Sequence, residues 1–377
     1  MRSKGAGPKK QRLLARPIIK ILLVTIIGLG LVLSISDVRK IVTVAQKIEA
    51  FPLFFAFVAT IFSYLFVGLA LQKLLDLVGE HLSFREMFAI SWVSTSLNYL
   101  VSTGGVGGLT MRVFLLRKKE ISFSETFLVS FIHTFLINGV LIGFVMFGFG
   151  YLLTNRGLHL YQYLTSGAVL ALALTLSLLA TGSVVDKAFR ERFIDFFYRW
   201  INRFSFRLTK KLIFKKVDLD EFKEDFHQGI SMMWTRKSGM VIPILYVFLD
   251  WFCCLLVLYF SFITIGYHIS PGVLVVGFAI GIFVSLVSFI PGAIGIMEGS
   301  MAAIYYSLDV PLEVAIIAVL LYRLVYYVFP FVTSIFLYYP LFKEAKAIKV
   351  SELSDKPLHA LKTSAANPRS FSGSKST

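Results

Sequence analysis

The sequence has few charged residues and few cysteines, and both shortages narrow its possible functions. Only 16% of its 377 residues are charged and 56% are hydrophobic, which excludes an ordinary water-soluble domain. Its two cysteines, Cys253 and Cys254, are adjacent within an apolar run. They are therefore interpreted as packing residues, and they predict neither a disulfide framework nor a metal site.

Motifs of soluble catalytic sites are also missing. The sequence has no P-loop, no H-E-x-x-H, no G-x-S-x-G and no cluster of cysteine with histidine. The predicted insert at 186–238 is too short for a separate catalytic domain. We therefore expect no catalytic residue of the soluble-enzyme types, no metal site and no cofactor.

What the chain does have is long apolar runs. Each is about 20 residues or more, which is the length that a helix needs to cross a bilayer. The runs lie at 18–36, 51–72, 123–153, 161–183, 241–263 and 313–341. The predicted fold is an all-α polytopic membrane protein with about six full spans. A basic tail at 1–17 precedes the membrane domain at 18–342, and the Ser/Lys/Pro-rich tail at 343–377 is predicted to be disordered.

The net charge of +16 is concentrated in a few segments. These are the N-terminal tail, residues 112–119, residues 187–216 and the tail after Lys343. Basic loops mark the cytoplasmic face of a membrane protein, so this reading is favoured over nucleic-acid binding. It predicts cytoplasmic N- and C-termini in a bacterial or archaeal cytoplasmic membrane. Segment 187–216 has the pattern of a basic amphipathic helix that lies on anionic lipid.

Two glycine-rich breaks interrupt apolar stretches, VSTGGVGGLTMR at 101–112 and FIPGAIGIMEGS at 289–300. If 84–118 and 271–308 each enter the membrane and return to the same side, the basic segments stay in the cytoplasm. The breaks match at an offset of 188 residues, and the same offset relates the flanking spans. The sequence thus predicts two re-entrant helical hairpins in inverted-topology repeats, a transporter architecture with its site at the breaks.

Backbone N–H groups at a helix start can bind an anion, which makes the residues of the breaks candidates for substrate binding. They are Gly104, Gly105, Gly107, Gly108, Pro291, Gly292 and Gly295. The alternative is that the glycines only allow helices to pack closely.

Polar and ionisable residues within the spans are the other candidates, because such groups are costly in lipid. They are Asn98, Arg112, His133, Asp250, Glu298 and Arg323. Glu298 and Arg323 are the preferred ion pair, and an arginine can hold a phosphate through two parallel hydrogen bonds. The alternatives are ion pairs that only lock helices together, an Arg112 that extends to the interface, and interhelical hydrogen bonds for Asn98 and His133.

The stretches GGVGGLTMRVFLLRKKEISFSE and FIPGAIGIMEGSMAAIYYSLDVPLEVAIIAVLLYRLVYY resemble the lysylphosphatidylglycerol synthase transmembrane region, a flippase-like family. The resemblance runs from about residue 18 to 342. It implies translocation of aminoacylated phosphatidylglycerol, without the separate cytoplasmic domain that charges the lipid. Thr103 stands where the family usually has proline, Leu109 and Thr110 where an acid is frequent, and His133 where an arginine is frequent.

The predicted function is translocation of an anionic or aminoacylated phospholipid, or of a lipid-linked head group, between leaflets. Arg112 and Arg323 would contact the anion, and Asp250 and Glu298 would balance charge or couple protons. A separate lipid-modifying enzyme is a possible partner, and the oligomeric state stays open. Two alternatives are an intramembrane enzyme that acts on a lipid or polyprenyl-linked substrate and a non-catalytic accessory subunit of a cell-envelope lipid pathway.

Overall fold

The computed structural model describes residues 43–100, 106–155, 160–209, 216–235, 237–287 and 291–343. Within these ranges the chain forms helices and no strand. The described residues up to Tyr338 belong to one compact unit. The predicted span at 18–36, the tip glycines Gly104 and Gly105, and most of the C-terminal tail lie outside the described residues.

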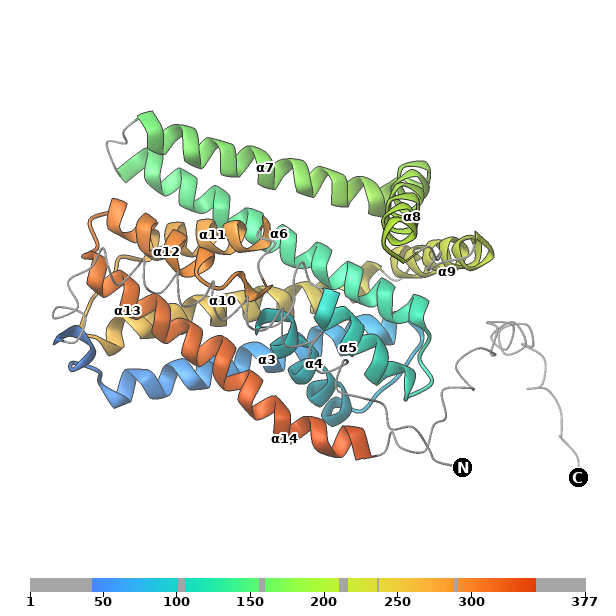
Figure 1. Cartoon of the computed structure of the whole chain (residues 1–377), viewed down its shortest axis with the longest axis horizontal. Helices are drawn as coiled ribbons and strands as arrows, with labels where there is room; N and C mark the ends of the chain where they lie inside the picture. Colours follow the sequence, from blue (N-terminus) through green and yellow to red (C-terminus); the bar gives the residue numbers. More distant parts are fainter. Residues whose placement is uncertain are drawn as a thin grey trace, which may run out of the picture. The chain divides into compact units, whose positions relative to one another are not determined.

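The helices form two similar series separated by an insert (Figure 1). The first series is α3 (Ala50–Val78), α4 (Phe84–Leu100), α5 (Val106–Arg117) and α6 (Phe123–Asn155). The insert holds α7 (Leu160–Val185), α8 (Lys187–Thr209), α9 (Lys216–Thr235) and η1 (Lys237–Met240). The second series is α10 (Val241–Thr264), α11 (Pro271–Val287), η2 (Pro291–Ala293), α12 (Ile296–Ser307), α13 (Leu312–Arg323), η3 (Leu324–Val328) and α14 (Phe329–Lys343).

Helix bounds follow the offset of 188 residues closely. Shifted by 188, α4 and α5 reproduce α11 and α12 to within two residues at each end. Shifted likewise, α6 covers the continuous run from α13 to α14 with the same tolerance. The two series thus share one order of elements, which is a long helix, a pair of short helices and a second long helix.

Four described segments are long and apolar enough to cross a membrane, namely Ala50–Val78, Phe123–Thr154, Ser238–Thr264 and Leu312–Leu337. A fifth crossing exists if the pair Leu170–Val185 and Lys187–Arg199, bent by 112°, counts as one span. This chain is therefore an all-α, multi-pass membrane protein. The predicted span at 161–183 lies within α7.

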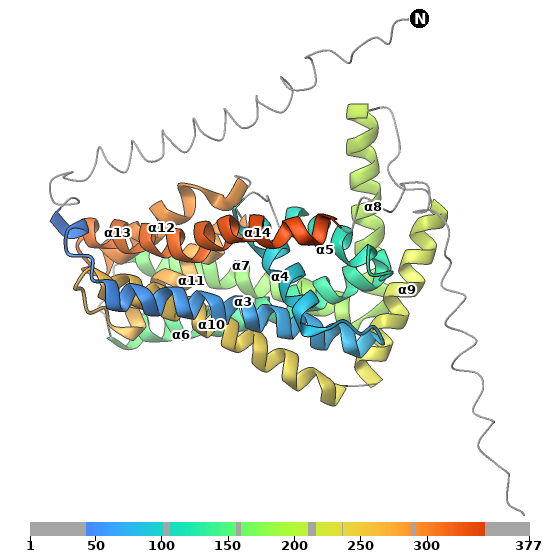
Figure 2. The same cartoon turned by 90° about the horizontal axis from the view of Figure 1, so that it is seen from below.

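Helices α3 and α10 lie side by side and antiparallel (Figures 1 and 2). The backbone N–H of Glu49, just before α3, donates to the carbonyl oxygen of Thr264 at the end of α10, at 2.8 Å. Small and apolar side chains on both helices fill the contact, because apolar helices in lipid associate through close packing.

The short helices α4 and α5 form the first hairpin. Its two open ends lie together, because Nζ of Lys119, just after α5, is 2.6 Å from Oε1 of Glu86 in the first turn of α4. The hairpin is closely packed, since a Cβ atom added to Gly108 of α5 would lie 2.5 Å from Cβ of Asn98 on α4.

The short helices α11 and α12 form the second hairpin. The hydroxyl of Tyr305 on α12 donates to the carbonyl oxygen of Leu274 on α11 at 2.9 Å. Glycine is required beside it, because a Cβ atom on Gly277 would lie 2.2 Å from the Tyr305 ring. A Cβ atom on Gly281 would similarly overlap Met301.

The two hairpins open at opposite ends of the α3–α10 pair and meet at their tips. The first follows the end of α3 and the second follows the end of α10, and these two helices are antiparallel. At the second tip, Gly292 has φ of +63°, which favours glycine. A Cβ atom there would also lie 2.5 Å from the carbonyl oxygen of Leu100, the last residue of α4.

The last span is distorted in the middle, at the π-helical segment η3. Pro330 lies just after it and has no N–H to donate to the carbonyl of Tyr326. The hydroxyl of Tyr64 on α3 reaches this carbonyl at 3.4 Å. The indole N–H of Trp92 on α4 donates to the carbonyl of Pro330 at 3.0 Å. Side chains of the first series therefore donate to two backbone carbonyls at the distortion, one of which loses its helical donor to Pro330.

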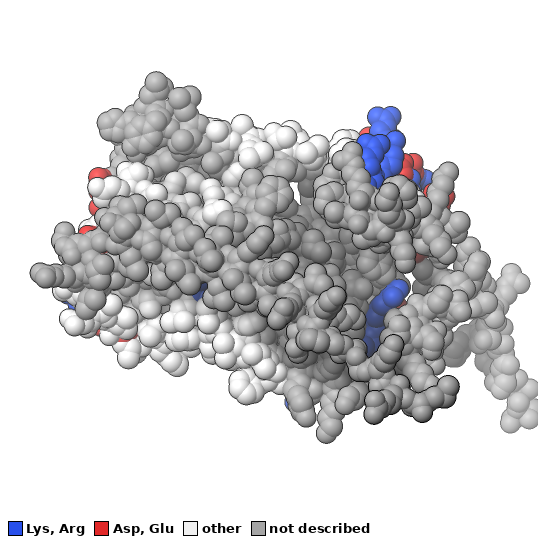
Figure 3. Space-filling model, in the orientation of Figure 1, with Lys and Arg blue, Asp and Glu red and all other residues white. Residues whose placement is uncertain are grey.

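Within the insert, α8 turns sharply away from α7, and a side chain of α8 caps the C-terminal end of α7. Arg190 is 4% exposed and donates to the carbonyls of Ser183 and Val184 at 3.2 and 3.0 Å. It also contacts Nδ1 of His227 on α9 at 2.6 Å. The other basic side chains of α8 include Lys187, Arg192, Arg199 and Arg203, which are exposed. Lys and Arg side chains gather around this helix in Figure 3.

Candidate functional site

The ion pair expected from the sequence is present at the tip of the second hairpin. Arg323 ends α13 and is the twelfth residue of the span Leu312–Leu337, so it lies near the middle of that span. Its Nη1 faces Oε1 of Glu298, and the two side chains are only 9% and 14% exposed. Its Nη2 donates to the carbonyl oxygen of Gly292. Arg323 therefore ties the last span to the second break.

The local sequence holds Glu298 in place. Gly295, with φ of +83°, precedes α12, and its backbone N–H donates to Oε2 of Glu298 at 2.8 Å. A carboxylate that reaches back to the residue before a helix satisfies one of the free N–H groups of the first turn. One oxygen of Glu298 thus fixes the start of α12, and the other faces Arg323.

Tyr327 lies against this pair and contacts further tyrosines, and the sequence analysis singled out none of them. The guanidinium carbon of Arg323 is 5.0 Å from the centre of the Tyr327 ring. The ring of Tyr99, at the end of α4, lies 5.7 Å from that of Tyr326 and 5.4 Å from that of Tyr327. The sequence could have revealed them through the spacing of Tyr322, Tyr326 and Tyr327 around Arg323, because these positions share one side of a helix.

Arg112 lies in a different group, between α5 and α6. It is 8% exposed, and its Nη1 donates to Oγ of Ser130 at 2.9 Å. His133 is 5% exposed and lies one turn beyond Ser130, close enough to Arg112 for a Coulomb interaction. Among the described residues no acidic side chain forms an ion pair with Arg112.

Three polar atoms in this Arg112 group have no hydrogen-bond partner among the residues that the structure describes. They are Nε of Arg112, Nε2 of His133 and Oδ1 of Asn98. Asn98 belongs to the group because it packs on Gly108, one helical turn before Arg112. Buried polar groups are usually paired, so these three atoms are groups with which a polar ligand could form hydrogen bonds.

Asp250 forms a third group, on α10. Oγ of Ser63 on α3 donates to its Oδ1, and Sγ of Cys254 lies 3.9 Å from the same oxygen. Oγ of Ser63 is also 3.0 Å from the hydroxyl of Tyr326. The four ionisable residues expected to share a site therefore fall into three groups, with Glu298 and Arg323 in one of them.

Of the glycines, Gly107 and Gly108 lie in the first turn of α5, and Gly295 directly precedes α12. Pro291 and Gly292 begin η2. Gly104 and Gly105 lie outside the described residues. Within the described ranges no group of three or more His, Cys, Asp and Glu side chains is placed to hold a metal ion.

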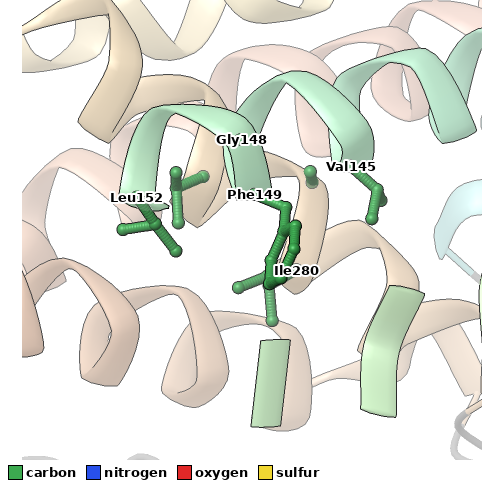
Figure 4. A pocket seen from close by; sticks show the side chains of 7 residues that line it. Val145, Gly148, Phe149, Leu152 and Ile280 are labelled. Atoms are coloured by element: carbon green, nitrogen blue, oxygen red, sulfur yellow. The ribbon is translucent and has the colours of Figure 1, made fainter. Parts of the chain in front are cut away.

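An apolar pocket lies between α6 and α11 (Figure 4). It is lined by Val145, Gly148, Phe149, Leu152, Val276, Ala279 and Ile280. None of these residues is charged, and none belongs to the three polar groups. It is a small apolar gap between the two packed helices, and it offers no polar side chain to a head group.

Residues 18–334 match the model of the family described as the lysylphosphatidylglycerol synthase TM region. The match covers both hairpins and the described spans, except for the last three residues of Leu312–Leu337. This chain belongs to that family. The resemblance noted in the two glycine-rich stretches is therefore confirmed.

Relatives of this member of the family include proteins from an archaeon and a bacterium. A UPF0104 membrane protein of Pyrococcus horikoshii is 26% identical over 318 residues, which cover 82% of this chain and 93% of that protein. A phosphatidylglycerol lysyltransferase of Staphylococcus aureus is 23% identical over 256 residues, which cover 68% of this chain. The chain spans only 25% of the length of that lysyltransferase.

Proposed function

We propose that this protein moves an anionic or aminoacylated phospholipid, or a lipid-linked head group, between the two leaflets. The observation that carries the proposal is Arg112, which is buried without an acidic partner among the described residues. Ser130 and His133, seven and ten residues into α6, place the Arg112 group roughly 10 to 15 Å along that helix. A head group bound there would lie between α5 and α6, inward of the first turns of that span.

Electrostatics favour an anion at Arg112. An unpaired charge in an apolar interior costs several kcal/mol, and a bound anion removes much of that cost. A phosphate can accept parallel hydrogen bonds from a guanidinium, and the unpaired atoms of Asn98 and His133 belong to the same group. Arg323 differs, since Glu298 already balances its charge.

The arrangement of the hairpins supports translocation. We infer that the two series are inverted-topology repeats, because their hairpins open at opposite ends of an antiparallel pair and touch at the tips. Transporters of this construction bind substrate near the midplane and expose it to one side at a time. The Arg323–Glu298 pair would lock the second tip. The basic α8 and the open end of the first hairpin would face the cytoplasm, and α8 would lie on anionic lipid.

The relatives favour a phospholipid as substrate. By its name, the Staphylococcus aureus relative transfers lysine to phosphatidylglycerol, and the match covers a quarter of that protein. We therefore infer that the substrate of this chain is phosphatidylglycerol or a lipid made from it. A separate lipid-modifying enzyme would supply any aminoacylated form.

Lipid translocation in proteoliposomes tests the proposal. Labelled phosphatidylglycerol and labelled phosphatidylcholine would be compared for wild type, Arg112→Gln and the control Arg117→Gln, which changes an exposed arginine of the same helix. We expect transport of the anionic lipid only, with a loss of about tenfold or more for Arg112→Gln, because a hydrogen bond to a charged group contributes about 1.5 to 3 kcal/mol. The control should match wild type.

Arg323→Gln and Glu298→Gln test the tip in the same assay. We expect both to slow transport of the anionic lipid while the protein stays folded in detergent. Wild type that moves neither lipid would contradict the proposal. In that case, chemical change of the lipid would favour an intramembrane enzyme, and unchanged lipid would favour an accessory subunit.

A further inference from the structure

Asp250 is a buried acid that the proposed head-group site does not use. It lies within the span Ser238–Thr264 and is 1% exposed. Its Oδ1 accepts the hydrogen bond from Ser63, and its Oδ2 is buried without a hydrogen-bond partner in the described part of the chain. A carboxylate in this position has lost its hydration and receives few hydrogen bonds from the protein to replace it.

No cationic side chain faces this acid among the described residues. The titratable groups that interact with it are Tyr64 of α3, Tyr99 of α4, Cys253 and Cys254 of α10, and Tyr326 of η3. All five are uncharged in their ordinary states near neutral pH. An ionised Asp250 would therefore have no protein charge to balance it within this group.

The surroundings favour a proton over a metal cation as the balancing charge. A sodium-like hard cation needs several oxygen ligands, and here one hydroxyl and one thiol approach Oδ1. A proton on Oδ2 needs no such cage, because it forms an O–H bond and leaves Oδ1 to accept from Ser63. The geometry thus fits a carboxylic acid that can gain or lose one proton.

A path of contacts leads from Asp250 to the junction of the hairpins. Ser63 and Cys254 both contact the hydroxyl of Tyr326, at 3.0 and 2.9 Å. Tyr326 is followed in η3 by Tyr327, whose ring lies against Arg323. The π-helical turn that carries both tyrosines is a distorted element of the kind often found at functional sites.

We propose that Asp250 binds and releases one proton in each transport cycle, so that a proton gradient drives the lipid translocation proposed above. Water on one side would give a proton to Oδ2 of the carboxylate, and the acid would return it to water on the other side. No group is oxidised or reduced. One proton and one monoanionic lipid that cross together carry no net charge across the membrane. This inference rests on the proposed function, and it names the energy source of that function.

Infrared difference spectroscopy on the full-length protein in liposomes tests proton binding without any transport. We expect wild type to show the carbonyl stretch of a protonated carboxylic acid that titrates with pH. This band should be missing in Asp250→Asn and present in Asp220→Asn, which makes the same change at an exposed position of α9. An unchanged band in Asp250→Asn, or no titrating band in wild type, would overturn the proposal.

A pH difference across proteoliposomes tests the coupling. With one proton per lipid, a difference of one pH unit should make labelled phosphatidylglycerol about tenfold asymmetric between leaflets, and reversal of the gradient should reverse the asymmetry. An internal pH dye should record proton movement in step with the lipid. Asp250→Asn should retain downhill movement of the lipid and lose both effects, whereas Asp250→Glu should retain them.

The outcomes separate the two proposals. Movement of lipid in wild type that ignores the pH gradient would overturn the role of Asp250 and leave the proposed function intact. Absence of lipid movement would count against the proposed function and, with it, against proton-driven transport. The infrared band would still decide whether Asp250 binds a proton. If Asp250→Asn does not fold, Asp250→Glu serves instead, and its band should be shifted from that of wild type.

Discussion

Removal of one partner of the ion pair between Arg323 and Glu298 should destabilise the protein far more than removal of both partners. Glu298→Gln leaves a guanidinium that is 9% exposed with no opposite charge beside it. Arg323→Gln leaves the Glu298 carboxylate, which keeps only the hydrogen bond from Gly295. Breaking a buried pair in this way costs about 3 to 5 kcal/mol.

The double variant carries two neutral amides of similar size and no unpaired charge. Its free energy of unfolding should therefore lie closer to that of wild type than the sum of the single changes predicts. The expected interaction energy in the double-mutant cycle is about 1 to 3 kcal/mol. The pair Lys119–Glu86 is the control, because its side chains are 28% and 35% exposed and such pairs contribute about 0 to 1 kcal/mol.

The assay is reversible unfolding in mixed micelles, followed by far-ultraviolet circular dichroism for all four proteins of each cycle. Single changes at Arg323 and Glu298 that each cost less than about 1 kcal/mol would refute the reasoning, because they would behave as an exposed pair does. Additive effects would also refute it, since they would show that the two side chains do not interact.

Two further changes test the packing. Gly277→Ala should lower the free energy of unfolding by about 1 to 3 kcal/mol, because its Cβ would overlap the buried ring of Tyr305. The control is Gly143→Ala on α6, where nothing lies within 4 Å of the added Cβ, and it should be neutral or stabilising in the same unfolding assay. Arg190→Gln should raise the rate of amide hydrogen exchange at the end of α7, because it removes donors from two carbonyls there. The control Arg203→Gln, on the exposed face of α8, should leave this rate unchanged. Equal rates in the two variants would contradict the capping role of Arg190.

Much of the fold could be predicted because the relevant signals are local. Hydropathy locates the spans, and the glycine–proline breaks locate the hairpin tips. The pair Arg323–Glu298 was also within reach, since both residues flank one short connection. The offset of 188 residues, found between the breaks and the flanking spans of the sequence, also relates the bounds of the helices in the two series.

The partners of the other buried polar groups could not be predicted in this way. Ser63 contacts Asp250 across 187 positions, and Tyr326 contacts Ser63 across 263, so only the packing of α3, α10 and η3 brings them together. Arg112 meets Ser130 only because α5 folds back along α6. The π-helical turn and the nearby Pro330 receive hydrogen bonds from donors on α3 and α4, and no local pattern reveals those distant donors.

The contact of Gly292 with the end of α4 also has a consequence for the membrane as an electrical insulator. A carrier that opens toward either side must never leave a continuous file of water, or ions would leak and dissipate the gradients of the cell. Here the backbone of one hairpin tip reaches the carbonyl of Leu100, with no side chain between them. If the protein is the carrier proposed above, a bulkier residue at 292 would push the tips apart and open a path for small ions through the resting protein.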